Sequence, residues 1–393
     1  MMKLRTLLIT LLSFYFSLLS CQIKVRLFTE QNPDAAFFTV TSGKYIIRNG
    51  TGWSVVEGVD DQLIIARYYS KVLIKLLDKE GIICDSVYFK GQTGKDCFSI
   101  RIGTPESLKR NYAADLRCFS DMETLLLINT LDVEKYIAGV VKAEGGSGKG
   151  EEYFKTQAVI ARTYTYKYFD KHDVDKYNLC DGTHCQAFNG IINDSLIINS
   201  VLSTKGLVIT TPDSNLIIST FHSNCGGETS PSEYAWVTGQ SYLKRTVDPY
   251  CTNSRNTHWE RHLSINDWTD FLEKNNFQGS IGDTSLLNFK QPSRVQDYKV
   301  GSFSIPLRTI RTAFDLRSTF FSVKVIGDSL LLNGRGYGHG VGLCQEGAMV
   351  MAANGFNYHQ IINFYYSGVL IMDIKNAVLL PAGLTPKPPK GGL

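Results

Sequence analysis

The sequence predicts an α+β fold in which antiparallel β structure predominates and a few helices interrupt the strands. Residues 23–121 consist of short β-rich runs, such as IKVRLF and FFTVTSG, separated by turns of Asn, Asp and Gly. Residues 133–144 instead place apolar side chains at helical spacing. Further β-rich runs and a last helix at about 345–354 complete the pattern.

Composition sets the size and charge class of the protein. A chain of 393 residues with 43% hydrophobic content is long enough for two or three cores. The formal net charge is only +4, and Lys3 and Arg5 lie in an N-terminal segment that we expect to be removed. A nearly neutral mature chain gives no support to nucleic-acid binding. We expect a signal peptide at 1–21, a β-rich region at 22–121, a second domain at 122–375 with an irregular excursion at about 238–314, and a disordered, proline-rich tail at 376–393.

The N-terminus predicts export to the cell envelope, that is, the periplasm or the outer surface. A basic start, MMKLR, precedes the apolar run Leu7–Leu19, which is too short for a membrane span of about 20 residues. The segment Leu18–Cys21 resembles a bacterial lipoprotein cleavage box, which would make Cys21 an acylated N-terminus. Ordinary signal-peptide cleavage is the alternative. Membrane contact is therefore expected only through a lipid at Cys21.

Export also affects how the other cysteines are interpreted. In an oxidising compartment an even set predicts disulfides, and the sequence leaves their connectivity open. The set is Cys84, Cys97, Cys118, Cys180, Cys185, Cys225, Cys251 and Cys344.

Two helices separated by a glycine loop are predicted in the middle of the chain. Asp132 is placed to cap the first helix, whose apolar stripe ends at Glu144. GGSGKG breaks this helix, and Glu151–Phe169 forms the second, which is acidic at its N-terminus as the helix dipole favours. SLIINSVL, KGLVITT and NLIISTFHS are predicted as strands, and FFSVKVIGDSLLLNGRGYGHG as a hairpin with its turn near Gly327–Asp328.

Glu144 is the first candidate for chemistry. Helical spacing puts its carboxyl group at the C-terminal end of an apolar stripe, against the glycine loop. Partial burial and a helix C-terminus both raise the pKa of a carboxyl group. A carboxyl group that stays protonated near neutrality can act as a general acid. A solvated glutamate on a fraying last turn is the alternative that these residues leave open.

The segment HDVDKYNLCDGTHCQAF is a candidate metal site. Imidazole and thiolate groups together are ligands that structural zinc accepts in a tetrahedral site. The spacing is not that of a standard zinc finger, and a Cys180–Cys185 disulfide closing a small loop is the alternative. The candidate ligands are His172, Cys180, His184 and Cys185.

Glycine occupies alternate positions in GRGYGHGVG, from Gly334 to Gly342, around His339. Glycine destabilises ordinary helices and strands by roughly 0.5–1 kcal/mol relative to alanine. The alternation therefore predicts positive φ angles or a backbone that lies close to another group, as in a tight loop or a floor beneath an extended ligand. FHSNCGGETS is interpreted as a binding loop or a turn, because His222 and Ser223 would point to opposite faces of a strand.

Five segments occur in the order found in the SpoIID/LytB family, the stage II sporulation protein D and amidase-enhancer proteins of bacterial cell walls. The chain resembles this family over roughly 23–373, most sharply in VEKYIAGVVKAE, FKTQAVIARTY, CDGTHCQAF, FHSNCGGET and the segment 334–368. The resemblance implies a peptidoglycan lytic transglycosylase acting on glycan strands stripped of their stem peptides. Residues 122–375 would be its catalytic domain, whose helices carry the catalytic glutamate and the groove-lining glycine-rich motif.

The resemblance also implies roles for individual residues. The family's catalytic glutamate falls on Glu144, which would protonate the bond between N-acetylmuramic acid and N-acetylglucosamine. The same carboxylate would then take the proton of the muramyl 6-hydroxyl as the 1,6-anhydro ring closes, so that one carboxylate replaces the usual pair. A structural zinc ion is implied at Cys180, His184 and Cys185, with His172 as the fourth ligand. Substrate contacts are expected from Gln157, Arg162, His222, Ser223, Gly226, Gly227, Tyr337, His339 and Gln345.

Other functions remain open at this stage. LytB-type members enhance a separate amidase, and on this alternative the chain would bind glycan strands and a cell-wall amidase without cutting. A zinc hydrolase would need an open coordination position, which cysteine-rich sites usually lack. Cys225 and Cys344 stand where relatives in the family usually carry other small residues, and a disulfide between them across the groove is a further hypothesis.

Overall fold

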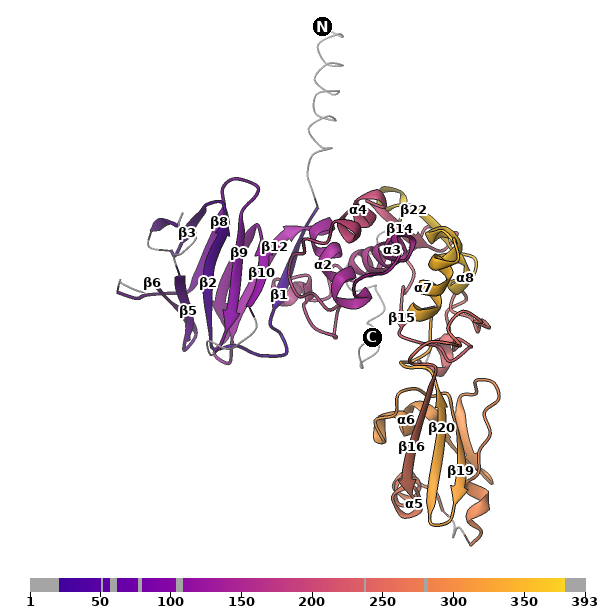
Figure 1. Ribbon diagram of the computed structural model, residues 1–393. Coiled ribbons are helices and arrows are strands. Elements are labelled where there is room, and N and C mark those ends of the chain that lie inside the picture. Colours follow the sequence, from indigo (N-terminus) through magenta and orange to yellow (C-terminus); the bar gives the residue numbers. More distant parts are fainter. Residues whose placement is uncertain are drawn as a thin grey trace. The chain divides into compact units, whose positions relative to one another are not determined.

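The structure is a computed structural model that describes residues 21–50, 52–56, 62–76, 80–103, 109–236, 238–278 and 282–378. The expected signal peptide, except for Cys21, and the expected tail from residue 379 onward lie outside the described residues. No helix in the described part of the chain is long and apolar enough to cross a membrane. Mostly antiparallel strands with interspersed helices confirm the α+β prediction (Figure 1).

The chain divides into two units, which are described separately. Unit 1 contains the residues up to Glu144 together with Tyr168–Ile198, and unit 2 contains Gly145–Lys167 and the residues from Asn199 onward. The chain therefore passes from one unit to the other more than once, and the predicted boundary near residue 121 does not coincide with the division between the units.

Unit 1 contains two facing β-sheets, which confirms the predicted β-rich region. Their strand orders are β13-β1-β12-β11-β8-β3-β4 and β10-β9-β2-β5-β6-β7, and of the described strand pairs in these two sheets only β1 and β13 are parallel. Aromatic rings from both sheets meet in the core, where Phe38 stacks on Phe89 with ring centroids 4.3 Å apart. The strands are β1 (Gln22–Leu27), β2 (Ala35–Ser42), β3 (Tyr45–Arg48), β4 (Trp53–Val56), β5 (Gln62–Tyr68), β6 (Lys71–Leu76), β7 (Ile82–Cys84), β8 (Ser86–Gly91), β9 (Cys97–Ile102), β10 (Lys109–Ala113), β11 (Asp115–Ser120), β12 (Leu125–Asp132) and β13 (Leu179–Cys180).

Helix α2 (Val133–Gly145) follows β12 directly. Asp132 caps it as predicted, because one carboxylate oxygen accepts hydrogen bonds from the backbone N–H groups of Glu134 at 2.9 Å and Lys135 at 3.2 Å. The apolar stripe, including Tyr136 and Val140, is fully buried. This stripe fixes the rotation of the helix and therefore the direction of Glu144 at its end.

The run SLIINSVL forms helix α4 (Ser195–Ser203), so the prediction of a strand at this position is wrong. Ile197 and Val201, one helical turn apart, are buried at 0% and 1% exposure. Asp194 supplies the N-terminal cap by accepting a hydrogen bond from the Ile197 N–H group at 3.4 Å. Burial at helical spacing, together with this cap, outweighs the β propensity of the isoleucines.

Unit 2 is organised around helix α3 (Glu151–Lys167), which the sequence predicted almost to the residue. Residues 153–154 and 156–165 of this helix are buried. The predicted hairpin is present as β19 and β20, and the helix predicted at about 345–354 is present as α7. It is not the last helix as expected, because Asn357 caps a further one, α8. The other elements here are β14 (Leu207–Thr210), β15 (Phe221–His222), η3 (Ser232–Tyr234), β19 (Phe321–Ile326), β20 (Ser329–Arg335), β21 (Leu343–Cys344), α7 (Gln345–Ala353), α8 (Tyr358–Tyr365), β22 (Leu370–Asp373) and η5 (Ile374–Asn376).

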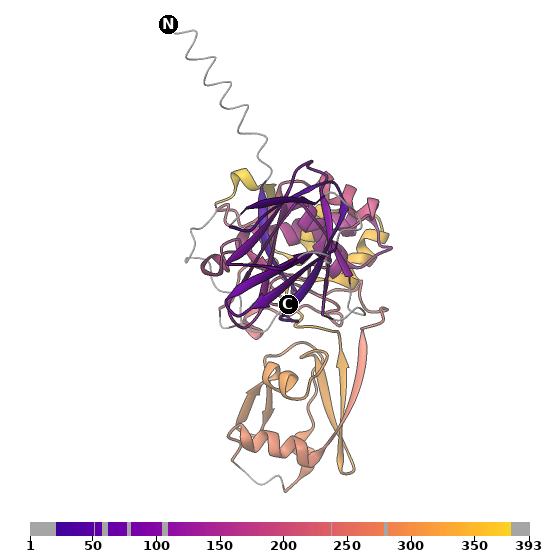
Figure 2. The ribbon, with the colours of Figure 1, turned by 90° about the vertical axis from the view of Figure 1, so that its left-hand side faces the viewer.

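Residues 238–314, expected to be an irregular excursion, contain regular elements with their own core. The residues are polar at the surface, but Trp268, Leu272, Tyr298 and Ile310 are fully buried and pack with the hairpin strands. Figure 2 shows this part of unit 2, drawn in orange, as helices packed on strands. Its elements are β16 (His258–Ser264), α5 (Ile265–Lys274), η4 (Thr284–Leu287), β17 (Asp297–Val300), β18 (Phe303–Pro306) and α6 (Leu307–Ala313).

Candidate functional site

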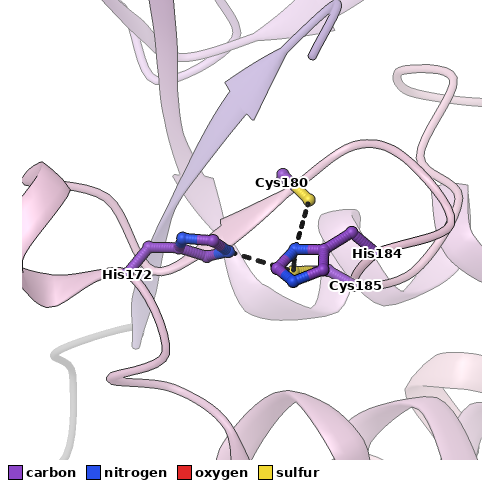
Figure 3. A group of neighbouring side chains, drawn as sticks. All are labelled: His172, Cys180, His184 and Cys185. Carbon is purple, nitrogen blue, oxygen red and sulfur yellow. Dashed lines mark hydrogen bonds between the residues drawn. The ribbon is translucent and has the colours of Figure 1, made fainter. Parts of the chain in front are cut away.

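A compact group of metal-type ligands lies in unit 1, in the segment between α3 and α4. We call it the histidine–cysteine cluster, and Figure 3 shows its four side chains turned toward one another. The Cys185 sulfur lies 3.5 Å from His172 Nε2 and 3.8 Å from His184 Nδ1, and the Cys180 sulfur lies 3.7 Å from the same His184 nitrogen. The cluster is His172, Cys180, His184 and Cys185, whose ligand atoms all lie within 4.8 Å of one another.

Neighbouring groups hold the cluster in a form suited to a metal. His172 Nδ1 lies 3.3 Å from an Asp175 carboxylate oxygen, which leaves Nε2 directed at the cluster. The thiol of Cys185 hydrogen-bonds to the Cys180 sulfur and thereby lowers the pKa of Cys180, which favours the thiolate that binds metal. Both cysteines are free thiols in the structure. Two imidazoles and two thiols around one point fit a tetrahedral zinc ion.

Asp181 anchors the segment that carries the cluster. Its carboxylate accepts hydrogen bonds from the backbone N–H groups of Phe28 at 2.6 Å and Thr29 at 3.0 Å, and pairs with the Arg110 guanidinium at 3.1 Å. These contacts tie the residue next to Cys180 to the strand region of unit 1. Asp181 lies within the motif CDGTHCQAF, and its anchoring role follows only from the tertiary contacts.

Glu144 lies at the end of α2 and contacts the same segment. Its Oε1 accepts a hydrogen bond of 2.8 Å from the backbone N–H of Ala187, two residues after Cys185. Burial raises the pKa of Glu144, and the Ala187 hydrogen bond partly offsets this effect. The direction of the shift agrees with the sequence-based expectation. Glu144 is therefore poised to be protonated at a higher pH than an ordinary glutamate.

Glu144→Gln is expected to stabilise the fold at neutral pH, on the order of 1 kcal/mol. Because the pKa of Glu144 is higher in the folded chain, the wild type loses stability as the pH rises from about 4.3, the ordinary glutamate value, through the folded pKa. Glutamine mimics the protonated group, so the gain should vanish near pH 4 and be largest above pH 7. Urea unfolding at pH 4 and pH 8 measures this difference. The exposed Glu123, changed to Gln, is the control, and an equal gain at both pH values contradicts the prediction.

Two predicted residues from distant segments, His222 and His339, meet in unit 2. Their rings lie edge to face with centroids 5.5 Å apart. The Val341 N–H donates to His339 Nδ1 at 3.0 Å, so His339 Nε2 carries the proton and lies 3.3 Å from the Thr220 hydroxyl. His222 Nδ1 donates to the Val341 carbonyl at 3.1 Å, which leaves Nε2 as a buried acceptor without a hydrogen-bond partner among the described residues.

Both imidazoles are neutral at pH 7. Burial, together with Arg311, lowers the pKa of His339 to about 4, and burial, with His339 beside it, holds the pKa of His222 well below its usual range. They therefore serve as hydrogen-bonding groups rather than as proton donors. We call these two side chains, with Tyr337 and Trp236, the imidazole patch.

The imidazole patch includes an aromatic residue that the sequence analysis missed. Trp236 has its ring centroid 6.5 Å from that of His339. The predicted Tyr337 is 45% exposed, and the exposed Arg317 lies over its ring, 5.9 Å from the centroid. Nothing in the local sequence around Trp236 distinguishes it from a core residue, since its position depends on contacts between distant segments.

The glycine-rich stretch owes its composition to contacts within unit 2. Gly338 has φ of 108°, and a Cβ there would lie 2.9 Å from the His222 Cβ. Gly342 has φ of 72°, and a Cβ there would collide with the Thr220 carbonyl oxygen. The predicted positive φ angles and close approach are confirmed. Gly336, Gly338 and Gly342 approach the segment 220–226 of the chain itself, whereas Gly334 lies against Trp259 and Gly340 against Arg294.

The other predicted contact residues are mostly enclosed. Arg162 is fully buried and donates to the carbonyls of Leu207 at 3.1 Å and Val201 at 3.2 Å. This placement assigns its guanidinium to the packing of unit 2. Gln157 and Gln345 are buried at 2% and 8% exposure. Ser223 and Gly227 are half-buried, and Gly226 is buried.

Cys225 and Cys344 lie close together, as their matched positions suggested, but both are free thiols. The Cys225 N–H group donates to the Cys344 sulfur at 3.3 Å. They share their surroundings with Cys251 and Asp248, neither of which the sequence analysis connected to them. A disulfide between Cys225 and Cys344 therefore does not describe this site.

Comparison with known proteins identifies relatives of this chain. The family described as "SpoIID: Stage II sporulation protein" matches residues 121–211, which include Glu144 and the histidine–cysteine cluster. An uncharacterized protein of Brachyspira hyodysenteriae is 29% identical over 258 residues, covering 64% of this chain and 69% of that protein. Stage II sporulation protein D of Bacillus subtilis is 27% identical over 270 residues, covering 63% and 76%.

A further relative extends the comparison to the amidase-enhancer branch of the SpoIID/LytB family. The amidase enhancer of Bacillus subtilis is 26% identical over 288 residues, covering 60% of this chain and 40% of that protein. The order of the five motifs, the matched range and these relatives agree. The chain is therefore similar to both branches of the SpoIID/LytB family, the stage II sporulation protein D and the amidase-enhancer proteins.

Proposed function

We propose that this protein is a peptidoglycan lytic transglycosylase that cleaves peptide-stripped glycan strands between N-acetylmuramic acid and N-acetylglucosamine. Similarity to the SpoIID/LytB family supports a function in the bacterial cell wall. The specific proposal of a lytic transglycosylase reaction rests on the environment of Glu144. Its carboxyl group is half-buried at the end of α2, burial raises its pKa, and it accepts a hydrogen bond from the Ala187 N–H group.

Glu144 acts first as acid and then as base. Its proton passes to the glycosidic oxygen while the bond from that oxygen to the anomeric carbon breaks. The carboxylate then takes the proton of the muramyl 6-hydroxyl group, and the oxygen of that hydroxyl group bonds to the anomeric carbon. No water is consumed, and the acid is regenerated. The Ala187 N–H group stabilises the transient carboxylate, so one residue serves both steps.

We further propose that the histidine–cysteine cluster holds a structural zinc ion. Four protein ligands complete a tetrahedral site, which leaves no position for a reacting water and argues against a zinc hydrolase. The ion would fix the Cys180–Ala187 segment and, with it, the N–H group on Glu144. Bound zinc would therefore support the active site through the backbone.

The imidazole patch is proposed to bind the glycan strand. Exposed Tyr337 and neighbouring Trp236 offer faces for sugar rings. Stripped muramic acid carries a free lactyl carboxylate, and Arg317 supplies a cation beside Tyr337. This charge match favours strands from which the stem peptides have been removed.

Arg317→Ala is expected to weaken binding of stripped glycan strands about threefold to tenfold, in the range of a partly solvent-screened charge-assisted hydrogen bond. Chitin oligomers lack the lactyl carboxylate and should bind the wild type and the variant equally. Titration of both oligomers measures the effect, and Arg317→Lys should restore part of it. An equal loss for chitin would exclude carboxylate recognition by this residue.

Product analysis tests the proposed reaction. Stripped strands incubated with the wild-type protein should yield fragments with 1,6-anhydro ends, identified by mass spectrometry. Reducing ends would mean hydrolysis with water admitted to the site. Strands that are bound but not cut would favour the second candidate function, a glycan-binding enhancer of a cell-wall amidase. The similarity to a relative named amidase enhancer motivates this candidate. In that case a purified amidase should act faster in the presence of this protein.

The proposed substrate requires export of the chain to the envelope. Cys21, at the start of the described residues, is exposed, which is compatible with a lipid anchor or with simple cleavage before the first strand. Labelling of cells with a fatty-acid analogue, comparing wild type with Cys21→Ser, separates the two.

A further inference from the structure

A second group of metal-type ligands lies buried in unit 2. Three cysteine sulfurs and one carboxylate oxygen all lie within 4.8 Å of one another. We call this group the thiol–carboxylate cluster. All four residues are 0% exposed: Cys225, Asp248, Cys251 and Cys344.

Three separate segments supply these ligands. Cys225 follows strand β15, Asp248 and Cys251 lie in one turn, and Cys344 is the N-terminal cap of α7. The Cys225 sulfur lies 3.3 Å from the Cys251 sulfur and 3.2 Å from Asp248 Oδ2. The three segments therefore converge on a single point in the interior.

Backbone donors surround the sulfurs. The Cys344 sulfur accepts hydrogen bonds from the N–H groups of Cys225 at 3.3 Å and Gly347 at 3.4 Å, and the Cys251 sulfur accepts one from Gly227 at 3.3 Å. The N-terminus of α7 adds a favourable dipole at Cys344. N–H donors and a helix N-terminus stabilise thiolates, which are the forms that bind metal ions.

Asp248 is oriented as a ligand would be. Its Oδ2 accepts a hydrogen bond from the Tyr365 hydroxyl at 2.9 Å, and its Oδ1 accepts one from the Tyr250 N–H group at 2.9 Å. Such partners fix the direction of ligating carboxylates. A carboxylate buried beside three sulfurs costs free energy unless a cation is close. The buried Arg294 guanidinium donates a hydrogen bond to the Cys225 carbonyl at 2.8 Å and supplies one positive charge nearby.

Disulfide bonding does not account for this arrangement. A bond between any two of the sulfurs leaves the third, with Asp248, buried and without a function. A metal ion uses all four groups. Three thiolates and a carboxylate in a closed, buried site suit zinc, which accepts both ligand types in tetrahedral geometry.

We propose that the thiol–carboxylate cluster binds a structural zinc ion through Cys225, Cys251, Cys344 and Asp248. The ion would join the segment after His222 to the turn before α7, and so hold the two sides of the imidazole patch in place. Zinc binding at this site requires neither the histidine–cysteine cluster nor the proposed enzymatic activity.

Metal analysis of the full-length protein tests the proposal. Protein purified with Zn²⁺ and desalted should contain two zinc ions per chain, and Cys251→Ala should contain one fewer than the wild type. Cys118→Ala, which removes a buried thiol outside both clusters, should match the wild type. Unchanged zinc content in Cys251→Ala would overturn the proposal, as would a Cys225–Cys251 disulfide found by peptide mapping without reductant.

A second variant covers the case in which Cys251→Ala does not fold. Asp248→Cys supplies a fourth thiolate and should keep the wild-type metal content. With Co²⁺ in place of zinc, the thiolate-to-metal charge-transfer absorbance of this variant should exceed that of the wild type by the contribution of one additional thiolate ligand. Equal absorption would overturn the proposal. Cys185→Ala separates the two sites, since its loss of metal reports only on the histidine–cysteine cluster.

Discussion

Glu144→Gln should abolish the release of 1,6-anhydro fragments from stripped glycan strands, with a loss of at least about 10²–10⁴-fold, the range contributed by a general acid or base. Glutamine keeps an oxygen that can accept the Ala187 hydrogen bond, but it has no proton to donate and cannot take one up. Binding of the strands should persist, because the imidazole patch is unchanged. Mass spectrometry of the products and titration of the strands measure the two effects separately.

The matched control is Glu123→Gln, which changes an exposed glutamate of the same unit. It should cleave at the wild-type rate. Glu144→Asp keeps the carboxyl group but retracts it, so partial activity is expected. Full turnover by Glu144→Gln would end the assignment of this residue as acid and base, whatever the products are.

Cys185→Ala should lose one zinc ion and unfold at a lower temperature. A structural ion present at about 1,000 times its Kd stabilises a fold by about 4 kcal/mol. In a domain of 150–250 residues this corresponds to about 8–16 °C in melting temperature. Cleavage should also fall, because the backbone around Ala187 no longer holds Glu144. Calorimetry, metal analysis and product analysis measure the three effects.

The control for this variant is Cys118→Ala, which removes a fully buried sulfur without touching either cluster. The modest loss of stability expected for Cys118→Ala measures only the free-energy cost of the cavity that the removed thiol leaves. A Cys185→Ala protein with wild-type metal content and melting temperature would rule out a structural ion at this site. Loss of cleavage with an unchanged melting temperature would instead favour a metal that takes part in the reaction.

Patterns within short segments predicted much of the fold. The spacing of apolar residues located α2 and α3, and Asp132 marked the beginning of α2. Alternating β-rich runs predicted the sheets of unit 1, and the hairpin of β19 and β20 followed from its turn. These features depend on contacts between near neighbours, which the sequence displays directly.

Local spacing also predicted the histidine–cysteine cluster and the environment of Glu144. All four ligands come from one segment, so their proximity follows from a short stretch of chain. The run SLIINSVL shows the limit of this reasoning. Its isoleucines favour a strand by propensity, and only burial against the rest of the protein makes it a helix.

The sequence by itself determined the family resemblance, the positions of α2 and α3 and the residue proposed for catalysis, because motifs and periodicity are properties of contiguous residues. Tertiary structure alone brought Asp248 and Cys251 to Cys225 and Cys344, and Trp236 to the histidines. It also showed that three of the alternating glycines, Gly336, Gly338 and Gly342, accommodate the chain's own segment 220–226. These contacts join residues far apart in the chain, and close packing selects them in a way that no local pattern records.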